Sequence, residues 1–283
     1  MNKNFTISGF SDEISAEIAV QFEVLNKLGI KYFEPRGVNG ENISSLSEEK
    51  IIALKKQMDK SGIKVSSIGS PIGKIKIDDP FEPHFEVFKN TVKAAKILGT
   101  KYIRIFSFFI PKDEDVRKYR SEVFARLEKF LNYAKENDII LLHENEKEIY
   151  GEKGAECLDI METLGCENFR AVFDPANFVQ SGEDTKECYE MLEPHIEYMH
   201  IKDAVGDRVV PSGYGDGNVE YILSQLSKKD KKFFLSLEPH LGSFQGLADL
   251  ELDDKMEKLP QGGEGTFTLA HTALMEILER IGE

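Results

Sequence analysis

Short apolar runs that lead into polar residues recur along the whole chain. In the clearest one, residues 139–142 are Ile-Ile-Leu-Leu, and His143, Glu144, Asn145 and Glu146 follow them. An apolar run without alternation is typical of a strand buried on both faces, the kind found in parallel sheets. The pattern predicts eight strands, at residues 5–10, 30–33, 64–68, 102–106, 139–142, 170–173, 196–200 and 233–237.

Between the strands, apolar residues recur every three or four positions, which is the period of an amphipathic helix. In the segment that Ser47 begins, Leu54 and Met58 share one face, acidic residues occupy the first turn and Gly62 ends the pattern. Ser15 is expected to cap the first helix. The predicted helices span residues 15–28, 47–62, 83–98, 115–137, 154–164, 185–192, 219–226 and 266–281.

Strands and helices alternate eight times, and no linker rich in Pro, Gly or Ser divides the chain. One continuous series of this kind predicts a single (β/α)₈ TIM barrel over residues 1–283. The alternative is an open doubly wound sheet, which usually has a Gly-rich first turn, and residues 9–12, Gly-Phe-Ser-Asp, are not such a turn. The long connection at 242–265 follows the last strand, so we expect a lid or substrate wall there.

Charge narrows the range of partners. The 283 residues include 36 Lys and Arg against 50 Asp and Glu, a formal net charge of −14. Such a surface repels nucleic-acid phosphates and anionic membranes. The longest basic run, 228–232, precedes a predicted strand and is interpreted as a solvated turn. We therefore expect no nucleic-acid or membrane partner, and homo-oligomerisation is left open.

Cysteine usage and the N-terminal residues favour a cytoplasmic protein. Cys157, Cys166 and Cys188 are odd in number and lack the spacing of a metal site, so reduced thiols are expected. The first residues lack the apolar core of a signal peptide. No apolar stretch approaches the roughly 20 residues that a membrane span requires.

Four polar residues stand at the ends of the last four predicted strands: Glu144, Asp174, His200 and Glu238. Adjacent strand ends in a barrel surround one mouth, so these side chains are expected to converge. Carboxylates with one imidazole suit Mn²⁺, Mg²⁺, Co²⁺ or Zn²⁺. Without an ion, the three acids would raise one another's pKa values. Taken singly, each acid is explained as a loop residue or a cap, and Asp174 before Pro175 is an ordinary turn.

Five motifs surround these four residues, all between residues 139 and 241. They are HENE at 143–146 with IYG at 149–151, FDPANF at 173–178, HIKDA at 200–204, PSGYGDG at 211–217 and SLEPHL at 236–241. With these motifs the chain resembles, over its whole length, the sugar phosphate isomerase/epimerase group of xylose-isomerase-like TIM barrels. That group includes ketose 3-epimerases, inosose dehydratases and hydroxypyruvate isomerases.

The resemblance implies that Glu144, Asp174, His200 and Glu238 bind one divalent ion, with Mn²⁺ the first choice. It also implies that Glu144 and Glu238 flank a small carbohydrate substrate and exchange protons with it. Isomerising or epimerising a keto sugar removes a proton beside a carbonyl and returns one elsewhere. One carboxylate on each side can act as base and acid, while the ion stabilises the enediolate.

The chain also departs from the epimerases of this group. Asn177 stands where many of them have a second histidine, and an amide cannot act as an acid at neutral pH. Arg208 is the nearest arginine after His200, displaced from the usual place. Both are retained as candidate substrate contacts, together with Lys202 and Asp203.

Further candidate contacts come from the other strand ends. His240 lies two residues past Glu238 and therefore on the same side of the chain. Glu34 is a candidate for closing the sugar pocket, and a buried pair with Arg104 explains it equally well. His143 is expected to face away from the site and to pack against a helix.

Several functions fit these residues. The leading one is a metal-dependent isomerase or epimerase of a sugar, keto sugar or sugar derivative. A lyase, such as an inosose dehydratase or an enzyme cleaving 3-keto-glycosides or C-glycosides, shares the proton abstraction. An apurinic endonuclease on this fold should have more histidine ligands and a basic groove. A non-catalytic sugar-binding barrel would not need both Glu144 and Glu238.

Overall fold

Six parallel strands form the continuous part of the sheet in the computed structural model, which describes residues 4–241 and 262–282. All five pairings between them are parallel. Their apolar composition follows from burial between the helices and the barrel interior. In spatial order they are β1 (Phe5–Gly9), β12 (Phe233–Leu237), β9 (Ile196–Ile201), β8 (Phe169–Phe173), β7 (Ile140–Glu144) and β6 (Tyr102–Ile105).

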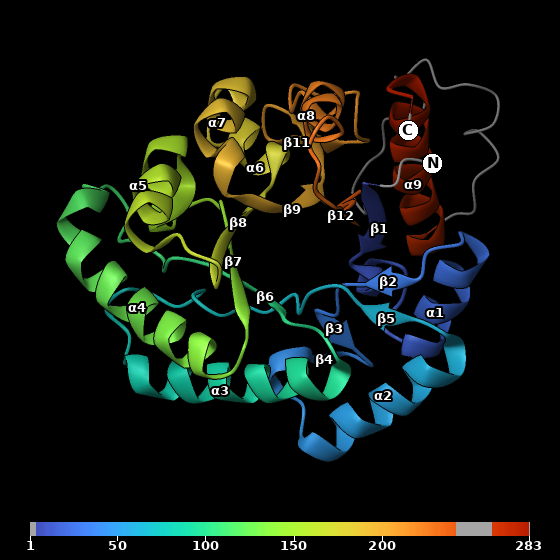
Figure 1. Ribbon diagram of the computed structural model, residues 1–283, viewed down its shortest axis with the longest axis horizontal. Coiled ribbons are helices and arrows are strands. Elements are labelled where there is room, and N and C mark those ends of the chain that lie inside the picture. The colour runs from blue at the N-terminus through green and yellow to red at the C-terminus, as the bar shows by residue number, and fades with distance from the viewer. Residues whose placement is uncertain (1–3, 242–261, 283) are drawn as a thin grey trace.

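Two short strands, β2 (Tyr32–Phe33) and β5 (Lys64–Val65), pair with each other and complete the wall. On one side, the Arg104 amide donates to the Ile68 carbonyl at 3.0 Å. On the other, the Glu34 amide donates to the Gly9 carbonyl at 2.9 Å. The eight strands therefore curl into a ring (Figure 1), and the predicted (β/α)₈ barrel is confirmed.

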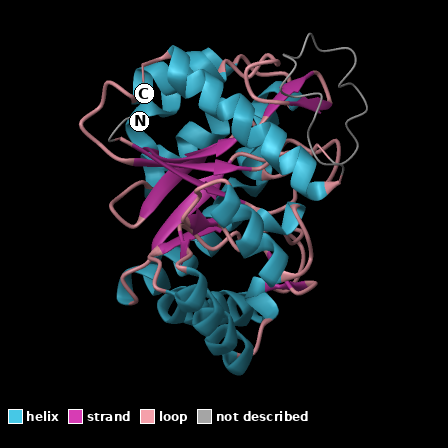
Figure 2. Ribbon diagram, turned by 90° about the vertical axis from the view of Figure 1, so that its right-hand side faces the viewer, coloured by secondary structure: helices cyan, strands magenta, loops and turns pink. Residues whose placement is uncertain are grey.

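Helices surround the strands on the outside, as the turned view in Figure 2 shows. The eight predicted helices are present, with ends shifted by a few residues. Ser47 caps its helix by accepting a hydrogen bond from the Lys50 amide, and Gly62 ends it with a φ of 71°. The helices are α1 (Ile18–Lys27), α2 (Glu48–Ser61), α3 (Phe81–Leu98), α4 (Arg120–Glu136), α5 (Gly154–Leu164), α7 (Thr185–Leu192), α8 (Val219–Leu226) and α9 (Gly263–Arg280).

Several elements were not predicted. Asp174 and Pro175 do not form a plain turn, because Asp174 caps the short helix α6 (Pro175–Gln180). Two hairpins also extend from the strand ends: β3 (Gly37–Val38) with β4 (Glu41–Asn42), and β10 (Asp203–Val205) with β11 (Arg208–Val210). Single 3₁₀ turns lie at Ser11–Glu13, Ile43–Ser45, Val116–Tyr119, Tyr150–Glu152 and Glu193–His195.

The expected cap of the first helix was wrong. Helix α1 begins at Ile18, and its N-cap residue, Glu17, makes no side-chain cap hydrogen bond. The Ile18 amide instead donates to Asn39 Oδ1 at 3.1 Å. Asn39 lies at the tip of the β3–β4 hairpin, so a tertiary contact replaces the local one. Ser15 accepts a hydrogen bond from Glu17 instead.

An apolar layer inside the barrel determines where the polar residues point. Leu142, Val172 and Tyr198 pack together as a buried cluster. Each precedes one of the predicted ligands by two positions, on β7, β8 and β9. Successive side chains of a strand alternate in direction, so residues two apart lie on the same side. The ligands therefore stand directly above this layer, at the C-terminal mouth.

Most of the predicted loop at 242–265 lies outside the described residues, and its last part, 263–265, belongs to α9. The three cysteines are free thiols. Across residues 4–241 and 262–282, no helix combines the length and apolar character that crossing a bilayer requires.

Candidate metal centre

Glu144, Asp174, His200 and Glu238 meet at the C-terminal mouth of the barrel. They are all buried, and one ligand atom from each lies within 4.8 Å of the others. Glu144 and His200 lie in β7 and β9, Asp174 and Glu238 directly follow β8 and β12, and these four strands are consecutive neighbours in the sheet. Parallel pairing thus delivers four side chains to one point, although the register shifts between β8 and β9 at Ala171 and Val172.

The imidazole of His200 faces the carboxylates with its Nδ1 atom. Nδ1 lies 2.9 Å from Glu144 Oε1 and 3.6 Å from Glu238 Oε2. Burial would lower the pKa of His200, but the charges of Glu144 and Glu34 outweigh it and raise that pKa to about 10. Burial would likewise raise the pKa of Glu144, yet His200 and Arg104 lower it to about 2.

Asp174 presents one oxygen to the helix and the other to the cluster. Its Oδ1 accepts the amide of Asn177 at 3.0 Å as the N-cap of α6. Its main chain is paired with the Asn145 side chain, which accepts from the Asp174 amide and donates to the Asp174 carbonyl. Within residues 4–241 and 262–282, neither Asp174 Oδ2 nor Glu144 Oε2 makes a hydrogen bond, although both are buried and each faces a cationic side chain. Buried carboxylate oxygens without hydrogen bonds, gathered beside an imidazole, fit a divalent cation.

Lys202 is buried among the same acids. Its Nζ lies 2.8 Å from Asp174 Oδ2, without hydrogen-bonding geometry, and 3.2 Å from Glu238 Oε2. Burial opposes the charge, but Asp174 and Glu238 together raise the pKa of Lys202, so the ammonium persists. Burial in turn raises the pKa of Asp174 to about 7, although Lys202 acts against that rise.

Arg104 supplies a second buried cation from β6. Its Nη1 lies 3.2 Å from Glu144 Oε2 and 3.8 Å from Glu238 Oε1. The guanidinium carbon is 4.9 Å from the ring centres of both Phe10 and Phe106. Arg104 therefore bridges the two glutamates, and the expected pair of Arg104 with Glu34 is not formed.

Glu34 lies instead on the far side of the His200 ring. Its Oε2 is 3.4 Å from His200 Nε2 and accepts a hydrogen bond from the Tyr198 hydroxyl at 2.9 Å. The alternative of a buried pair with Arg104 is therefore not realised. Because β2 is only two residues long, pattern alone did not determine which way the next residue points.

The outer rim joins the predicted contact His240 to Asp12, Glu13 and Arg36, which the sequence analysis did not single out. Arg36 lies 3.2 Å from Glu238 Oε1 through Nη1 and 2.9 Å from Asp12 Oδ2 through Nε. His240 Nε2 is 3.4 Å from Glu13 and 3.5 Å from Glu238. Burial, reinforced by Glu238, raises the pKa of Glu13 to about 7. The signal was available, since these polar residues also follow strands, at the ends of β1 and β2.

The remaining substrate candidates divide into two groups. Asn177 is buried at the cluster, where its Nδ2 lies 3.4 Å from Glu144 Oε1. The carboxylate of Asp203 accepts four backbone amides, those of Ala204, Gly213, Gly215 and Gly217. Arg208 is exposed on β11. The structure thus places Asn177, Lys202, His240 and Glu34 around the ligands, and gives Asp203 a loop-organising position.

Asp203 also explains the glycines of the 211–217 motif. A side chain at Gly215 or Gly217 would place Cβ only 2.3 or 2.6 Å from Asp203 Oδ1. Only glycine lets both amides approach the carboxylate so closely. His143 faces away from the cluster, as expected. It is buried, packs beside Phe169 of β8 and lies 3.0 Å from Ser107 Oγ.

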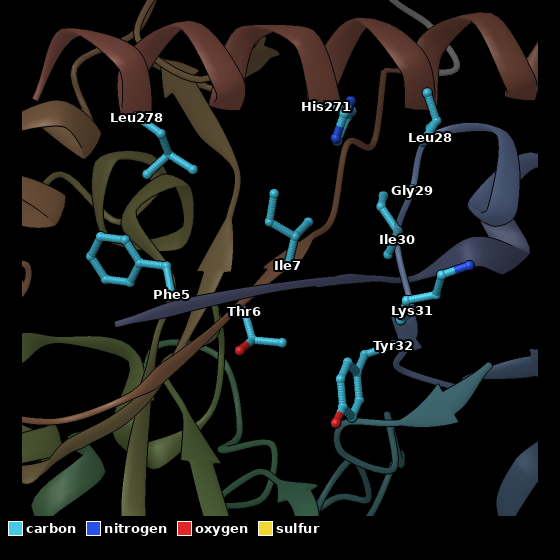
Figure 3. Close-up of a pocket in the computed structure, with 10 residues that line it drawn as sticks. All are labelled: Phe5, Thr6, Ile7, Leu28, Gly29, Ile30, Lys31, Tyr32, His271 and Leu278. Atoms are coloured by element: carbon cyan, nitrogen blue, oxygen red, sulfur yellow. The ribbon is translucent and has the colours of Figure 1, made fainter. Parts of the chain in front are cut away.

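A separate apolar cavity of about 210 Å³ lies at the other end of the strands. Figure 3 shows it between the start of β1, the segment before β2 and helix α9. Phe5, Ile30, Tyr32 and Leu278 are among its lining residues, and His271 is the one imidazole. It begins where β1 begins, whereas the ligands lie where the strands end, so it forms no part of the metal centre.

The fold and this cluster define a class: parallel (β/α)₈ barrels with carboxylates and a histidine gathered at the C-terminal mouth. The chain belongs to the xylose isomerase-like TIM barrel family, whose model matches residues 22–259. A search of curated proteins returned no match.

Solved structures resemble the chain over nearly its full length. The IOLI protein with a bound zinc atom is 16% identical, with a TM-score of 0.74 and 98% of each chain covered. The probable 3-DHS dehydratase AsbF from Bacillus anthracis is 15% identical, with a TM-score of 0.70 and 96% of this chain and 98% of that one covered. The 3-keto-D-glucoside 4-epimerase YcjR from E. coli is 12% identical, with a TM-score of 0.69 and 98% and 99% covered. At these identities the likeness establishes the fold.

Proposed function

We propose that this protein is a divalent-metal-dependent isomerase or epimerase that moves a proton beside the carbonyl of a sugar, keto sugar or sugar derivative. One observation carries the proposal: two buried glutamates, Glu144 and Glu238, offer carboxylate oxygens to the same cluster from strands β7 and β12, which have β8 and β9 between them in the sheet. An epimerase or isomerase needs two such proton carriers at one substrate carbon or at neighbouring carbons.

Glu144, Asp174, His200 and Glu238 would hold the ion, for which we propose Mn²⁺ first and Mg²⁺, Co²⁺ or Zn²⁺ as alternatives. An ion held there would supply Lewis-acid polarisation of a substrate carbonyl, which acidifies the neighbouring C–H bond. Asp174 Oδ2 and Glu144 Oε2, which make no hydrogen bond within the described residues, support this assignment, as does the zinc atom in the similar IOLI structure.

The side chains around the ligands have distinct tasks in this scheme. Arg104 and the other cations keep Glu144 and Glu238 ionised, and therefore able to accept a proton. Lys202 places a positive charge where an oxyanion develops on the substrate. Asn177 and His240 border the same space and offer hydrogen bonds to hydroxyl groups. Asp203 acts indirectly, by fixing the loop at 203–217. Arg208 lies on the outer strand of the hairpin that begins this loop.

A lyase is the second candidate. It would use the same proton abstraction and then expel a group from the next carbon. Asn177 favours it, because an amide beside Glu144 orients a leaving hydroxyl, which would receive the abstracted proton back from a glutamate and depart as water. The similar AsbF structure carries the name of a probable dehydratase.

The test combines metal analysis with proton exchange. Purified protein should hold about one divalent ion per chain, and it should exchange the α-proton of a keto sugar, inosose or 3-keto-glycoside in D₂O, followed by NMR. Glu144→Gln and Glu238→Gln should each abolish the exchange. The products distinguish an epimer from an unsaturated elimination product. Full activity after metal removal, or exchange at the wild-type rate in Glu238→Gln, would contradict the mechanism.

A further inference from the structure

The side of His200 that faces away from the carboxylate ligands contacts a buried acid. Glu34 has no exposed side-chain area, and its Oε2 lies 3.4 Å from His200 Nε2. The hydroxyl of Tyr198 donates to that same oxygen at 2.9 Å and is itself 2.8 Å from Ser66 Oγ. Tyr198 precedes His200 by two positions on β9, so both side chains point into the barrel. Glu34 is therefore held between a fixed tyrosine and the imidazole.

The two ring nitrogens of His200 face different acids. Nδ1 faces Glu144 and Glu238. A neutral imidazole that binds an ion through Nδ1 carries its proton on Nε2. Nε2 is buried and has no hydrogen-bond partner within residues 4–241 and 262–282, and Glu34 offers the carboxylate nearest to it. A contraction of a few tenths of an ångström would turn this contact into a hydrogen bond.

Burying a carboxylate at this position costs desolvation energy, so its presence calls for a functional explanation. Glu34 Oε1 is buried without a hydrogen-bond partner in the described part of the chain. Oε2 has the Tyr198 hydroxyl and the His200 ring as its neighbours. The buried cation Arg104 pairs with Glu144 and Glu238 and not with Glu34. A buried acid with so few partners calls for a specific explanation.

We propose that Glu34 is a positioning residue for the metal centre: it accepts a hydrogen bond from the Nε2–H group of His200 and so fixes the tautomer and ring orientation that leave Nδ1 free to bind the ion. Tyr198 holds Glu34 in place for this task. The inference rests on the proposed function, because it requires a divalent ion at the four ligands. This positioning role replaces the predicted substrate contact of Glu34, because the His200 ring lies between Glu34 and the other three acids.

The direct test is metal affinity without substrate. Full-length protein is stripped of metal, and the Kd values for Mn²⁺ and Zn²⁺ are measured by calorimetry and by competition with a chromophoric chelator. Glu34→Ala should weaken binding by about 10- to 100-fold, the usual effect of losing the partner of a ligating histidine. Glu34→Gln keeps an acceptor oxygen and should weaken binding less. Tyr198→Phe leaves Glu34 in place and should have the smallest effect of the three.

Glu197, which lies on β9 with Tyr198 and His200, provides a matched control. It too accepts a tyrosine hydroxyl, that of Tyr102 at 2.6 Å, but it pairs with Lys231 outside the cluster. Glu197→Gln therefore removes a similar tyrosine–glutamate contact without touching His200, and it should bind both ions as the wild type does. Thermal unfolding of each metal-free variant verifies that the protein is folded before titration.

A second measurement reports the tautomer itself. In zinc-loaded protein with ¹⁵N-labelled histidine, His200 should carry its proton on Nε2, and Glu34→Ala should alter that signal while Glu197→Gln leaves it unchanged. Wild-type affinity in Glu34→Ala, or a raised KM with unchanged metal affinity, would overturn the positioning role and leave the proposed function intact. A wild-type protein that binds neither ion would refute both.

Discussion

The two halves of the barrel contribute differently to the site. The C-terminal half supplies all four proposed ligands, from strands β7, β8, β9 and β12, which are five or six residues long and pair in parallel. The N-terminal half supplies Glu34, Arg36 and Arg104 around them, while Lys202 and His240 come from the C-terminal half. In the N-terminal half, β2 and β5 have two residues each. The proposed ligands thus lie in or directly after the longer strands, whereas Glu34 and Arg36 follow the two-residue β2 and Arg104 lies within β6.

The difference shows how this architecture separates two requirements. Convergence of four ligands needs fixed spacing, which long parallel pairing provides. Adjusting the charge of those ligands needs a few cations at short range, and these tolerate irregular backbone as long as each side chain reaches its partner. Changes in the N-terminal half should therefore alter stability and affinity while the backbone positions of the four proposed ligands persist.

Arg104 offers the strongest way to test this separation. Arg104→Met leaves Glu144 and Glu238 buried without the cation that bridges them, which should lower the free energy of unfolding by about 3–5 kcal/mol. Urea denaturation of the metal-free protein measures the loss. Saturating Mn²⁺ should restore part of it, because a ligand that binds only the folded state stabilises it. A variant as stable as the wild type would show that the cation is dispensable.

Asp203 should have the next largest effect. Asp203→Ala removes a buried carboxylate that accepts four backbone amides, and it should cost roughly 2–3 kcal/mol, the range for hydrogen bonds to charged groups. Arg208→Ala, on the exposed strand of the same hairpin, should stay within about 0.5 kcal/mol of the wild type. Equal losses in the two variants would contradict the loop-organising position of Asp203.

Arg36 tests the rim, where water screens the charges. Its contacts with Asp12 and Glu238 are partly exposed, with 26% of the Arg36 side chain accessible. Arg36→Ala should therefore cost no more than about 1 kcal/mol. The loss should shrink in high salt, whereas that of Arg104→Met should not. Unfolding curves at two ionic strengths distinguish the two arginines, and an identical salt response would remove the distinction between rim and interior.

The smallest expected effect concerns the first helix. Asn39→Ala removes the acceptor for the Ile18 amide and should cost about 1 kcal/mol, as the loss of a cap does. Ser15→Ala, which removes the residue first expected to be the cap, should cost less than about 0.5 kcal/mol. Thermal unfolding of both variants decides which residue caps α1, and a reversed order would favour Ser15.

The sequence predicted the regular parts of this molecule better than the connections. Eight apolar runs with helical spacing between them specify the barrel, and the polar residue after each of the last four strands specifies a position in the mouth. Helix α6 was missed although Asp174 before Pro175 is a common helix start, with Pro at the first position. Its short length left no apolar period to recognise.

Contacts of the N-terminal half could not be derived in the same way. Arg104 reaches Glu144 on the neighbouring strand and Glu238 across the mouth, so its partners depend on closure of the ring. Asn39 caps a helix that begins 21 positions earlier in the chain. Pairings of this kind arise from the assembled barrel, and no local pattern encodes them.

The two aromatic rings that pack against Arg104 hold its charge in one position during any reaction at the mouth. Phe10 and Phe106 each lie 4.9 Å from its guanidinium carbon, so this charge cannot swing toward a developing anion or away from it. A charge already in its final position requires no reorganisation as a reaction proceeds, unlike water, which must turn its dipoles. The barrel carries this immobile electrostatic field before any substrate arrives.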